Sequence, residues 1–270
     1  MCAAMISSAH SATTQGGFPM DARKQQILDY IASKGFATPE ELARQHRVAA
    51  ITVRRDLVWL EKAGHLKRVH GGAIPSESPL AVTHVNTRLR AAAGEKRAIA
   101  RAAAALVQAG DRLFIDAGST CRFLAEALPD SADLTVMTHS LDIVTVLAHR
   151  PGFRLIMLGG EFDPRLNAFI SPMTETALGS FSADKAFLGA QGVDINRGVS
   201  SNGMSEERIK ALMAHNAKQA FVLADSSKLG KVAFRSVLPL SRVFGVITDA
   251  SASPPFCAAL RRKGIRVIKG

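Results

Sequence analysis

Two neighbouring arginines, Arg54 and Arg55, stand in a stretch whose apolar residues recur with helical spacing. At about 100° per residue, Val53, Leu57 and Leu60 fall on one stripe, which must face a core. Arg55 points almost opposite to that stripe. A guanidinium on the outer side of a helix can form paired hydrogen bonds with base edges in the major groove of DNA. The pattern therefore predicts a DNA-recognition helix, although adjacent arginines on a helix are also typical of an ordinary solvated face.

Two shorter helical segments precede the arginines, and a basic hairpin follows them. Residues 23–33 carry apolar side chains at helical spacing. Thr38 is expected to be the N-cap of a second helix that opens with a proline and two acidic residues. Residues 64–72 combine glycines with basic residues and predict a short hairpin. Together these elements predict a winged helix-turn-helix over residues 20–75.

The outer side of the predicted recognition helix and the hairpin supply the expected DNA contacts. These residues are Thr52, Arg54, Arg55, Lys67, Arg68 and His70. The helix is preceded by Ala49 and Ala50, which cannot cap it through a side chain. Thr52 could instead cap a helix that starts slightly later, and it would then leave the set of base-reading residues.

The rest of the chain alternates short apolar runs with helical stretches, beginning with an alanine-rich helix at about 95–108. Nearly every run is apolar throughout, which is typical of strands covered on both faces in a parallel sheet. The seven runs are Leu113–Ile115, Leu134–Met137, Leu155–Leu158, Ala186–Leu188, Phe221–Ala224, Val243–Thr248 and Ile265–Ile268. The pattern predicts a doubly wound α/β domain over residues 95–270, joined to the first by a linker at 76–94.

Small polar residues and glycines follow several of these runs. In an open parallel sheet the carboxyl ends of the strands line one crevice, where ligands bind. The segment Asp116-Ala-Gly-Ser-Thr120 leads from the first run into a helix, whose free N–H groups favour an anion. Lys228 could neutralise a phosphate there as a point charge. The other interpretation of this segment is an ordinary strand-to-helix turn.

Both halves resemble the DeoR (deoxyribose operon repressor) family of bacterial transcription regulators. The first half does so through Thr-Val-Arg-Arg-Asp-Leu from Thr52 and Leu-Lys-Arg-Val-His-Gly-Gly-Ala from Leu66. For this half, the resemblance implies that the helix-turn-helix lies at about 39–58 and that Lys67, Arg68 and His70 lie in or beside the wing. The second half does so through the segments that begin at Asp116, Ala186 and Ala224, and through the helix from Glu206 to Lys210. The resemblance implies an effector domain related in fold to ribose-phosphate isomerases, one that senses phosphorylated sugars or polyols.

Carried over position by position, the resemblance also implies the residues that contact the effector. The phosphate-and-sugar set is Asp116, Gly118, Ser119, Thr120 and Lys228, and the additional candidates for hydroxyl contacts are Glu206 and Asp225. His139 stands where many members of the family have asparagine. We expect it to be a local hydrogen-bond partner and not a ligand contact.

Composition agrees with a polyanionic partner. The net charge is +11, and residues 20–75 hold ten Lys+Arg against six Asp+Glu. No apolar run approaches the ~20 residues needed to cross a bilayer, and residues 1–19 lack the features of an export signal and predict a disordered tail. Three scattered cysteines predict neither a disulfide framework nor a zinc site. We therefore expect a cytoplasmic protein.

Three functions of different classes fit these observations. The first is a repressor that binds double-stranded operator DNA as a dimer or tetramer and is released by a phosphorylated sugar or polyol. In that case no residue is catalytic, and neither a cofactor nor a metal is needed. The second is a sugar-phosphate isomerase that uses Asp116, Glu206 or Asp225 as a base. The third is a nonspecific nucleoid-binding protein, which leaves the large α/β half without a role.

Overall fold

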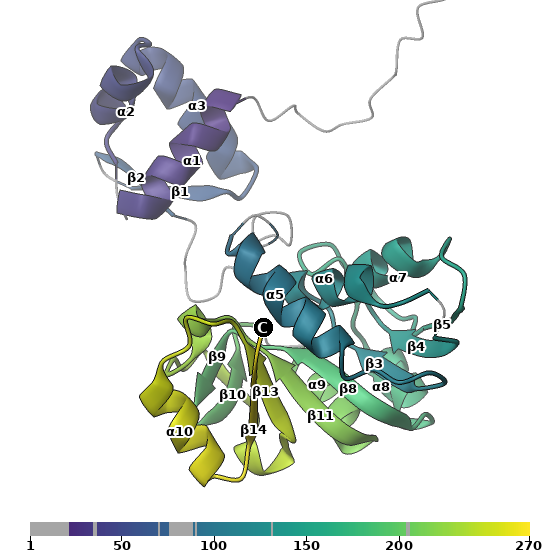
Figure 1. Ribbon diagram of the computed structural model, residues 1–270. Helices are drawn as coiled ribbons and strands as arrows, with labels where there is room; N and C mark the ends of the chain where they lie inside the picture. The colour runs from purple at the N-terminus through teal and green to yellow at the C-terminus, as the bar shows by residue number, and fades with distance from the viewer. Residues whose placement is uncertain are drawn as a thin grey trace, which may run out of the picture. The chain divides into compact units, whose positions relative to one another are not determined.

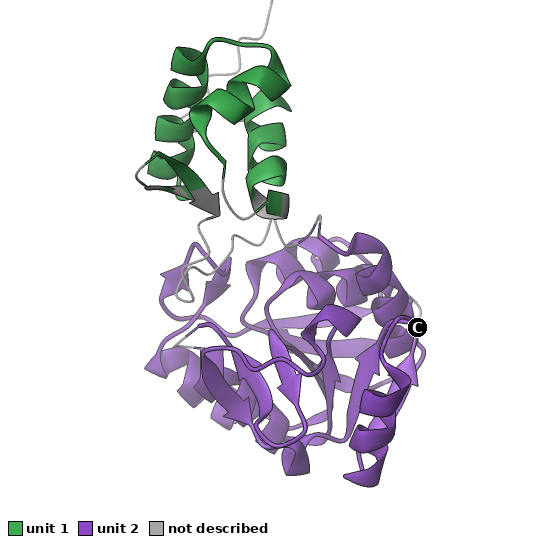
Figure 2. Ribbon diagram, turned by 90° about the vertical axis from the view of Figure 1, so that its left-hand side faces the viewer, with its two compact units in different colours: residues 1–77 green, residues 78–270 purple. Residues whose placement is uncertain are grey.

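The computed structural model describes residues 22–34, 37–69, 71–75, 89, 91–130, 132–203 and 206–270. The chain forms two compact units, Met1–Glu77 and Ser78–Gly270, coloured separately in Figure 2. The predicted tail 1–19, and residues 76–88 of the predicted linker, lie outside the described residues. Within the described part, every helix is too short or too polar to span a bilayer.

The described residues of the first unit form three helices and a two-stranded antiparallel sheet (Figure 1). Its elements are α1 (Ala22–Lys34), α2 (Pro39–His46), α3 (Ala50–Lys62), β1 (Leu66–Val69) and β2 (Gly72–Pro75). The three helices, β1 and β2 enclose one core, whose fully buried members include Ile27, Leu42 and Leu57. The predicted winged helix-turn-helix is confirmed in its order of elements.

Local sequence explains where the helices of this unit begin and end. The Thr38 hydroxyl accepts a hydrogen bond from the Glu41 amide at 3.1 Å, and the Thr38 amide donates one to the Glu41 carboxylate, so that the predicted N-cap is a complete capping box. Arg47 ends α2 in the left-handed conformation, with φ 53°, and makes the tight turn toward α3. Ala49 is the N-cap of α3 and has no side-chain hydrogen bond. The helix therefore starts at Ala50, and the alternative of a start capped by Thr52 is wrong.

The second unit is built on a seven-stranded parallel sheet with strand order β14-β13-β11-β8-β3-β4-β5. The strands are β3 (Arg112–Ile115), β4 (Leu134–Thr138), β5 (Phe153–Met157), β8 (Ala183–Gly189), β11 (Ala217–Leu223), β13 (Gly245–Thr248) and β14 (Arg266–Lys269). Each of the seven predicted apolar runs contributes one strand. Hydrogen-bonded parallel pairs hold every neighbour in this order together.

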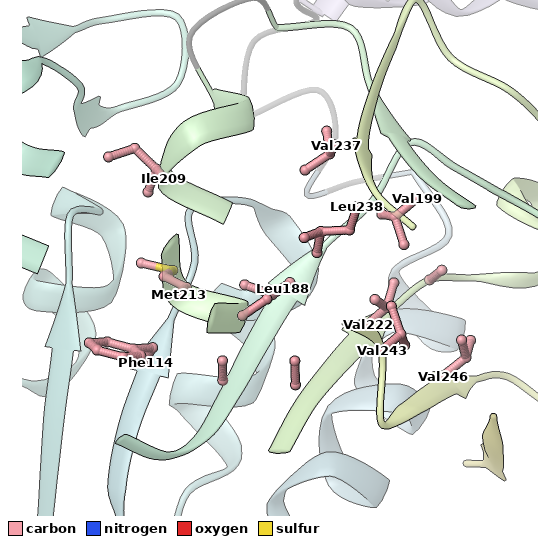
Figure 3. Close-up of a cluster of buried hydrophobic side chains, with 14 of the residues drawn as sticks. Phe114, Leu188, Val199, Ile209, Met213, Val222, Val237, Leu238, Val243 and Val246 are labelled. Atoms are coloured by element: carbon pink, nitrogen blue, oxygen red, sulfur yellow. The ribbon is translucent and has the colours of Figure 1, made fainter. Parts of the chain in front are cut away.

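Helices cover both faces of this sheet (Figure 1). They are α5 (Ala93–Ala104), α6 (Ser119–Ala127), α7 (Leu141–Leu147), α8 (Pro172–Gly179), α9 (Glu206–His215) and α10 (Pro254–Arg262). Leu113 and Ile115 of β3 pack with α5, α6 and α7 on one face. Phe114 faces the opposite core with Ile209 and Met213 of α9, as Figure 3 shows. In the inner strands, burial on both sides explains the apolar runs, whereas the edge strands β5 and β14 are only partly buried.

The predicted helix 95–108 is wrong at its carboxyl end. After Ala104 the chain tightens into turns, in which Leu106 N donates to Ala103 O and Val107 N to Ala104 O. The Gln108 amide donates to the Asp111 carboxylate at 2.7 Å, which draws the chain toward β3 instead of continuing the helix.

Two small antiparallel sheets accompany the large one and were not predicted. The strands β6 (Phe162–Asp163) and β7 (Ala168–Phe169) form a hairpin. The strands β9 (Gly192–Asp194), β10 (Gly198–Ser201) and β12 (Arg235–Leu238) form a sheet with order β12-β10-β9. Two short 3-10 turns, η1 (Ser226–Lys228) and η2 (Leu240–Arg242), complete the unit.

Candidate functional site

The first candidate site is the outer side of α3. Val53, Leu57 and Leu60 are at most 2% exposed and fix the inner side of the helix. Arg54 and Arg55 are exposed on the other side. The next residue, Asp56, is buried and anchors α3 to α1, because its carboxylate accepts a hydrogen bond from Arg23 Nε at 2.8 Å. The sequence Arg-Arg-Asp thus divides into two outward cations and one inward anchor.

The two arginines differ in their partners. Arg54 pairs with Glu40 of α2 at 2.8 Å, and both side chains are more than half exposed. Arg55 makes no hydrogen bond or ion pair within the described part of the chain. The donors of Arg55 are therefore available to a ligand, whereas Arg54 must break its bond to Glu40 before that guanidinium donor can bind DNA.

The other predicted DNA contacts are placed unevenly. Thr52 lies half-buried in the first turn of α3, where its amide donates to Ala49 O at 2.9 Å. Arg68 of β1 is tied to Glu61 of α3, since its amide donates to Glu61 Oε1 at 2.9 Å and its guanidinium lies 3.3 Å from Oε2. These bonds fix the hairpin against the recognition helix. His70 and the side chain of Lys67 lie outside the described residues.

The second candidate site lies at the carboxyl ends of β3 and β8. From β3 the chain proceeds through β4 to β5 at one edge, and from β8 it proceeds through β11 toward the other edge. The strand order therefore reverses between β3 and β8, and this switch point is where open α/β sheets bind ligands. Asp116 follows β3 there, and its carboxylate accepts a bond from the Gly189 amide of β8 at 2.8 Å.

Asp116 is the centre of a buried group of charges. Its carboxylate is 1% exposed and bonds to Lys210 Nζ of α9. Lys210 Nζ also lies 3.4 Å from Glu206 Oε2, one helical turn away. Burial alone would lower the pKa of Lys210, but the carboxylates of Asp116 and Glu206 outweigh burial and raise that pKa above its usual value. Lys210 is therefore a protonated donor and not a free amine.

The predicted anion cradle lies directly beside these charges. Gly118 is the N-cap of α6 at φ 135°, a conformation that side chains rarely adopt, and a Cβ built there would meet nothing within 4 Å. Ser119 is buried and Thr120 half-buried in the first turn of α6. In the part of the chain that the structure describes, no side chain caps this helix start. Its first amides are therefore open to an anion.

Asp225 and Lys228 follow β11, the strand beside β8. Asp225 is buried, and its carboxylate accepts bonds from the amide and hydroxyl of Ser227, so it caps the η1 turn. Lys228 ends the same turn half-buried, and the described residues offer its ammonium no ion pair. Of these two, the lysine has the group that is open to a ligand.

His139 lies at the end of β4, 1% exposed, with Nε2 3.8 Å from Asp116 Oδ1. Burial lowers the pKa of its imidazole below the ordinary 6.5, more strongly than Asp116 raises it. His139 Nδ1 and Glu206 Oε1 are buried without a hydrogen-bond partner in the described structure. Buried polar atoms are normally satisfied. Both atoms therefore remain available to a ligand that enters the group.

Sequence reasoning missed Lys210 as a site residue. It lies 94 positions from Asp116, and a strand and a helix bring the two together. The available signal was its spacing from Glu206, since residues four apart share one side of a helix.

Two family models match the chain. A DeoR-like helix-turn-helix domain matches residues 23–78, and a DeoR C terminal sensor domain matches residues 91–250. The HTH-type transcriptional repressor GlcR of Bacillus subtilis is 32% identical, with 92% of this chain and 95% of the relative covered. The Glycerol-3-phosphate regulon repressor of Escherichia coli (strain K12) is also 32% identical, with 84% of this chain and 90% of the relative covered.

Among solved structures, ribose 5-phosphate isomerase A of Methanocaldococcus jannaschii matches 50% of this chain and 53% of its own, with 20% identity and a TM-score of 0.36. This likeness is too low to carry an inference about activity or ligand.

Proposed function

This chain belongs to the DeoR family of helix-turn-helix transcriptional regulators, and on that premise we propose that it represses a carbohydrate or polyol catabolic operon and is released from its operator by a phosphorylated sugar or polyol. The family is one of regulators, so the isomerase alternative is dropped. A regulator with a sensor domain binds DNA and responds to a small molecule. The proposal concerns which molecule and which residues.

The observation that carries the proposal is the pairing of an open helix start with buried charges at the switch point. The amides of Gly118, Ser119 and Thr120 would hold the phosphate, and Lys228 would add a positive charge. Glu206 Oε1 has no hydrogen-bond partner among the described residues and would accept a hydrogen bond from a hydroxyl group. A phosphorylated polyol fits such a site, because its phosphate would meet the amide and lysine donors and its hydroxyls would meet the carboxylate.

The names of the relatives support this ligand class. One is a glycerol-3-phosphate regulon repressor, and glycerol phosphate is a phosphorylated polyol.

On the DNA side, Arg55 and Arg54 would contact base edges, and Thr52, Lys67, Arg68 and His70 would contact the groove or the phosphates. Two copies in a symmetric dimer, or in a tetramer, would place their recognition helices in major grooves about 34 Å apart. The effector would favour an arrangement that cannot meet this spacing.

A thermal-shift screen of phosphorylated sugars and polyols tests the effector. A ligand at 100 times its Kd stabilises the folded state by about 2.7 kcal/mol, and the unphosphorylated counterparts should give no shift. Each active compound should then release the protein from a DNA duplex selected from a random pool. If phosphorylated and unphosphorylated compounds act alike, the proposed phosphate site is wrong.

Lys228→Ala tests the residue assignment. We expect this variant to bind the duplex normally and to need at least ten times more effector for release, since a hydrogen bond to a charged group contributes about 1.5–3 kcal/mol. Lys231→Ala, an exposed lysine three positions on, is the matched control. Equal behaviour of the two variants would remove Lys228 from the site.

A further inference from the structure

The recognition helix exposes a large apolar side chain at its start. Ile51 is 58% exposed, in the first turn of α3. At 100° per residue, Ile51, Arg55 and Val58 lie within about 60° of one another around the helix. Val53 and Leu57, which face the core, lie on the other side. Ile51 therefore cannot serve the packing of its own unit.

Exposure of one apolar residue is ordinary on a protein surface. The position of Ile51 is what matters. The N-terminal residues of a recognition helix are those that meet base edges, and Ile51 shares its side of the helix with Arg55, the cation without a partner among the described residues. Ala49 and Ala50, which precede it, carry only methyl groups and let the helix start approach a groove closely.

The major groove offers an apolar side chain one complementary group, the C5-methyl of thymine. Arg55, four residues further along the helix, suits the O6 and N7 acceptors of guanine. The two Cα positions differ by about 6 Å along the helix axis, so the two side chains reach different base pairs.

We propose that Ile51 is a specificity-determining residue that reads the methyl group of a thymine close to the base pair contacted by Arg55. This inference rests on the proposed role of α3 as the reading helix. An apolar contact between Ile51 and thymine would then contribute to operator specificity, in addition to the hydrogen bonds of the arginines.

The experiment uses the full chain and a duplex that it selects from a random pool. Each thymine is replaced in turn by deoxyuridine, which removes the methyl group and keeps the base pair. We expect one thymine in each half-site whose replacement weakens binding by the wild-type protein about fourfold, the equivalent of about 0.8 kcal/mol for one buried methyl. The Ile51→Ala protein should bind the original duplex more weakly and should not respond to that replacement.

Matched variants separate this effect from a general loss of binding. Ile51→Val should keep most of the response to deoxyuridine, and Arg55→Ala should lose affinity yet keep the response. Ile51→Ala should leave the salt dependence unchanged, because isoleucine contacts no phosphate. The unfolding temperature of Ile51→Ala should be unchanged or slightly higher than that of the wild type, since alanine is the better helix former.

The failures of the two proposals are distinguishable. If the wild-type chain selects a duplex and Ile51→Ala responds to deoxyuridine as the wild type does, the role of Ile51 is overturned while the reading helix stands. If the wild-type chain selects no duplex, both are overturned.

Discussion

The candidate sites of the two units hold their charges in opposite ways. Arg54 and Glu40 in the DNA-binding unit pair in water, with side chains 59% and 56% exposed. Lys210 and Asp116 in the sensor unit pair out of water, with side chains 3% and 1% exposed. An exposed pair contributes little to stability and yields readily to an incoming polyanion. A buried ion pair separates only when a ligand replaces the hydrogen bonds between its members, which suits selective recognition of a small molecule.

The largest expected effect comes from removing the buried cation. Lys210→Met would leave the carboxylates of Asp116 and Glu206 buried without their partner and should cost about 3–5 kcal/mol in the free energy of unfolding of the sensor unit. Urea unfolding measures this cost. The control is Lys218→Met, because Lys218 pairs with Asp184 at 2.8 Å but is 73% exposed, and it should cost less than about 1 kcal/mol. Equal costs would show that the contrast in burial has no energetic meaning.

The next effect concerns DNA affinity. Arg55→Ala should weaken binding to a selected duplex by about 1–3 kcal/mol and relax the preference at one base pair. Fluorescence anisotropy with base-substituted duplexes measures both changes. Arg165→Ala, an arginine of the sensor unit that is 61% exposed, should leave them unaltered. Intact discrimination in Arg55→Ala would mean that another side of α3 reads the bases.

A smaller effect follows from the pKa of His139, which burial lowers below 6.5. Between the lowered value and 6.5, the unfolded chain binds a proton that the folded chain does not. Stability should therefore rise with pH up to about 6.5 and then level off. His139→Asn should reduce this rise, measured by urea unfolding across the pH range. A wild-type profile that falls with increasing pH in this window would contradict the buried neutral imidazole.

The smallest effect tests the exposed pair. Glu40→Gln frees the guanidinium of Arg54, and DNA affinity at low salt should increase by no more than about fivefold, since such a pair contributes 0.2–1 kcal/mol. Added salt should remove the gain. Weaker binding of this variant would show that Glu40 positions Arg54 for DNA instead of competing for it.

Features set by local sequence could be predicted. Thr38 and the acidic residues after it specified the start of α2, and the apolar runs of the inner strands were predictable because burial on both faces leaves little place for polar residues. The short strands β6, β9 and β12 could not be predicted. They span two to four residues and depend on pairing with partners elsewhere in the chain.

The parts of the candidate site that are adjacent in the sequence could be predicted, and the parts that the fold brings together could not. Gly118 and Ser119 stand beside Asp116 in the sequence, so their common place at a helix start was predictable. The bond from Lys210 to Asp116 depends on the packing of α9 against the sheet, which no short motif encodes. The difference between Arg54 and Arg55 likewise depends on Glu40, fourteen residues away from Arg54 on another helix.

The position of β8 beside β3 also bears on how the chain is made. Leu113 pairs with Lys185, so strand β3 has only β4 as a neighbour until more than seventy further residues have left the ribosome. A nascent chain exposes one edge of β3 throughout that interval, and unpaired strand edges are where aggregation begins. The helix-turn-helix is complete long before then. Chaperones that attend this protein during synthesis should therefore act on the open edge of β3 while the stretch between Ile115 and Ala183 is being made.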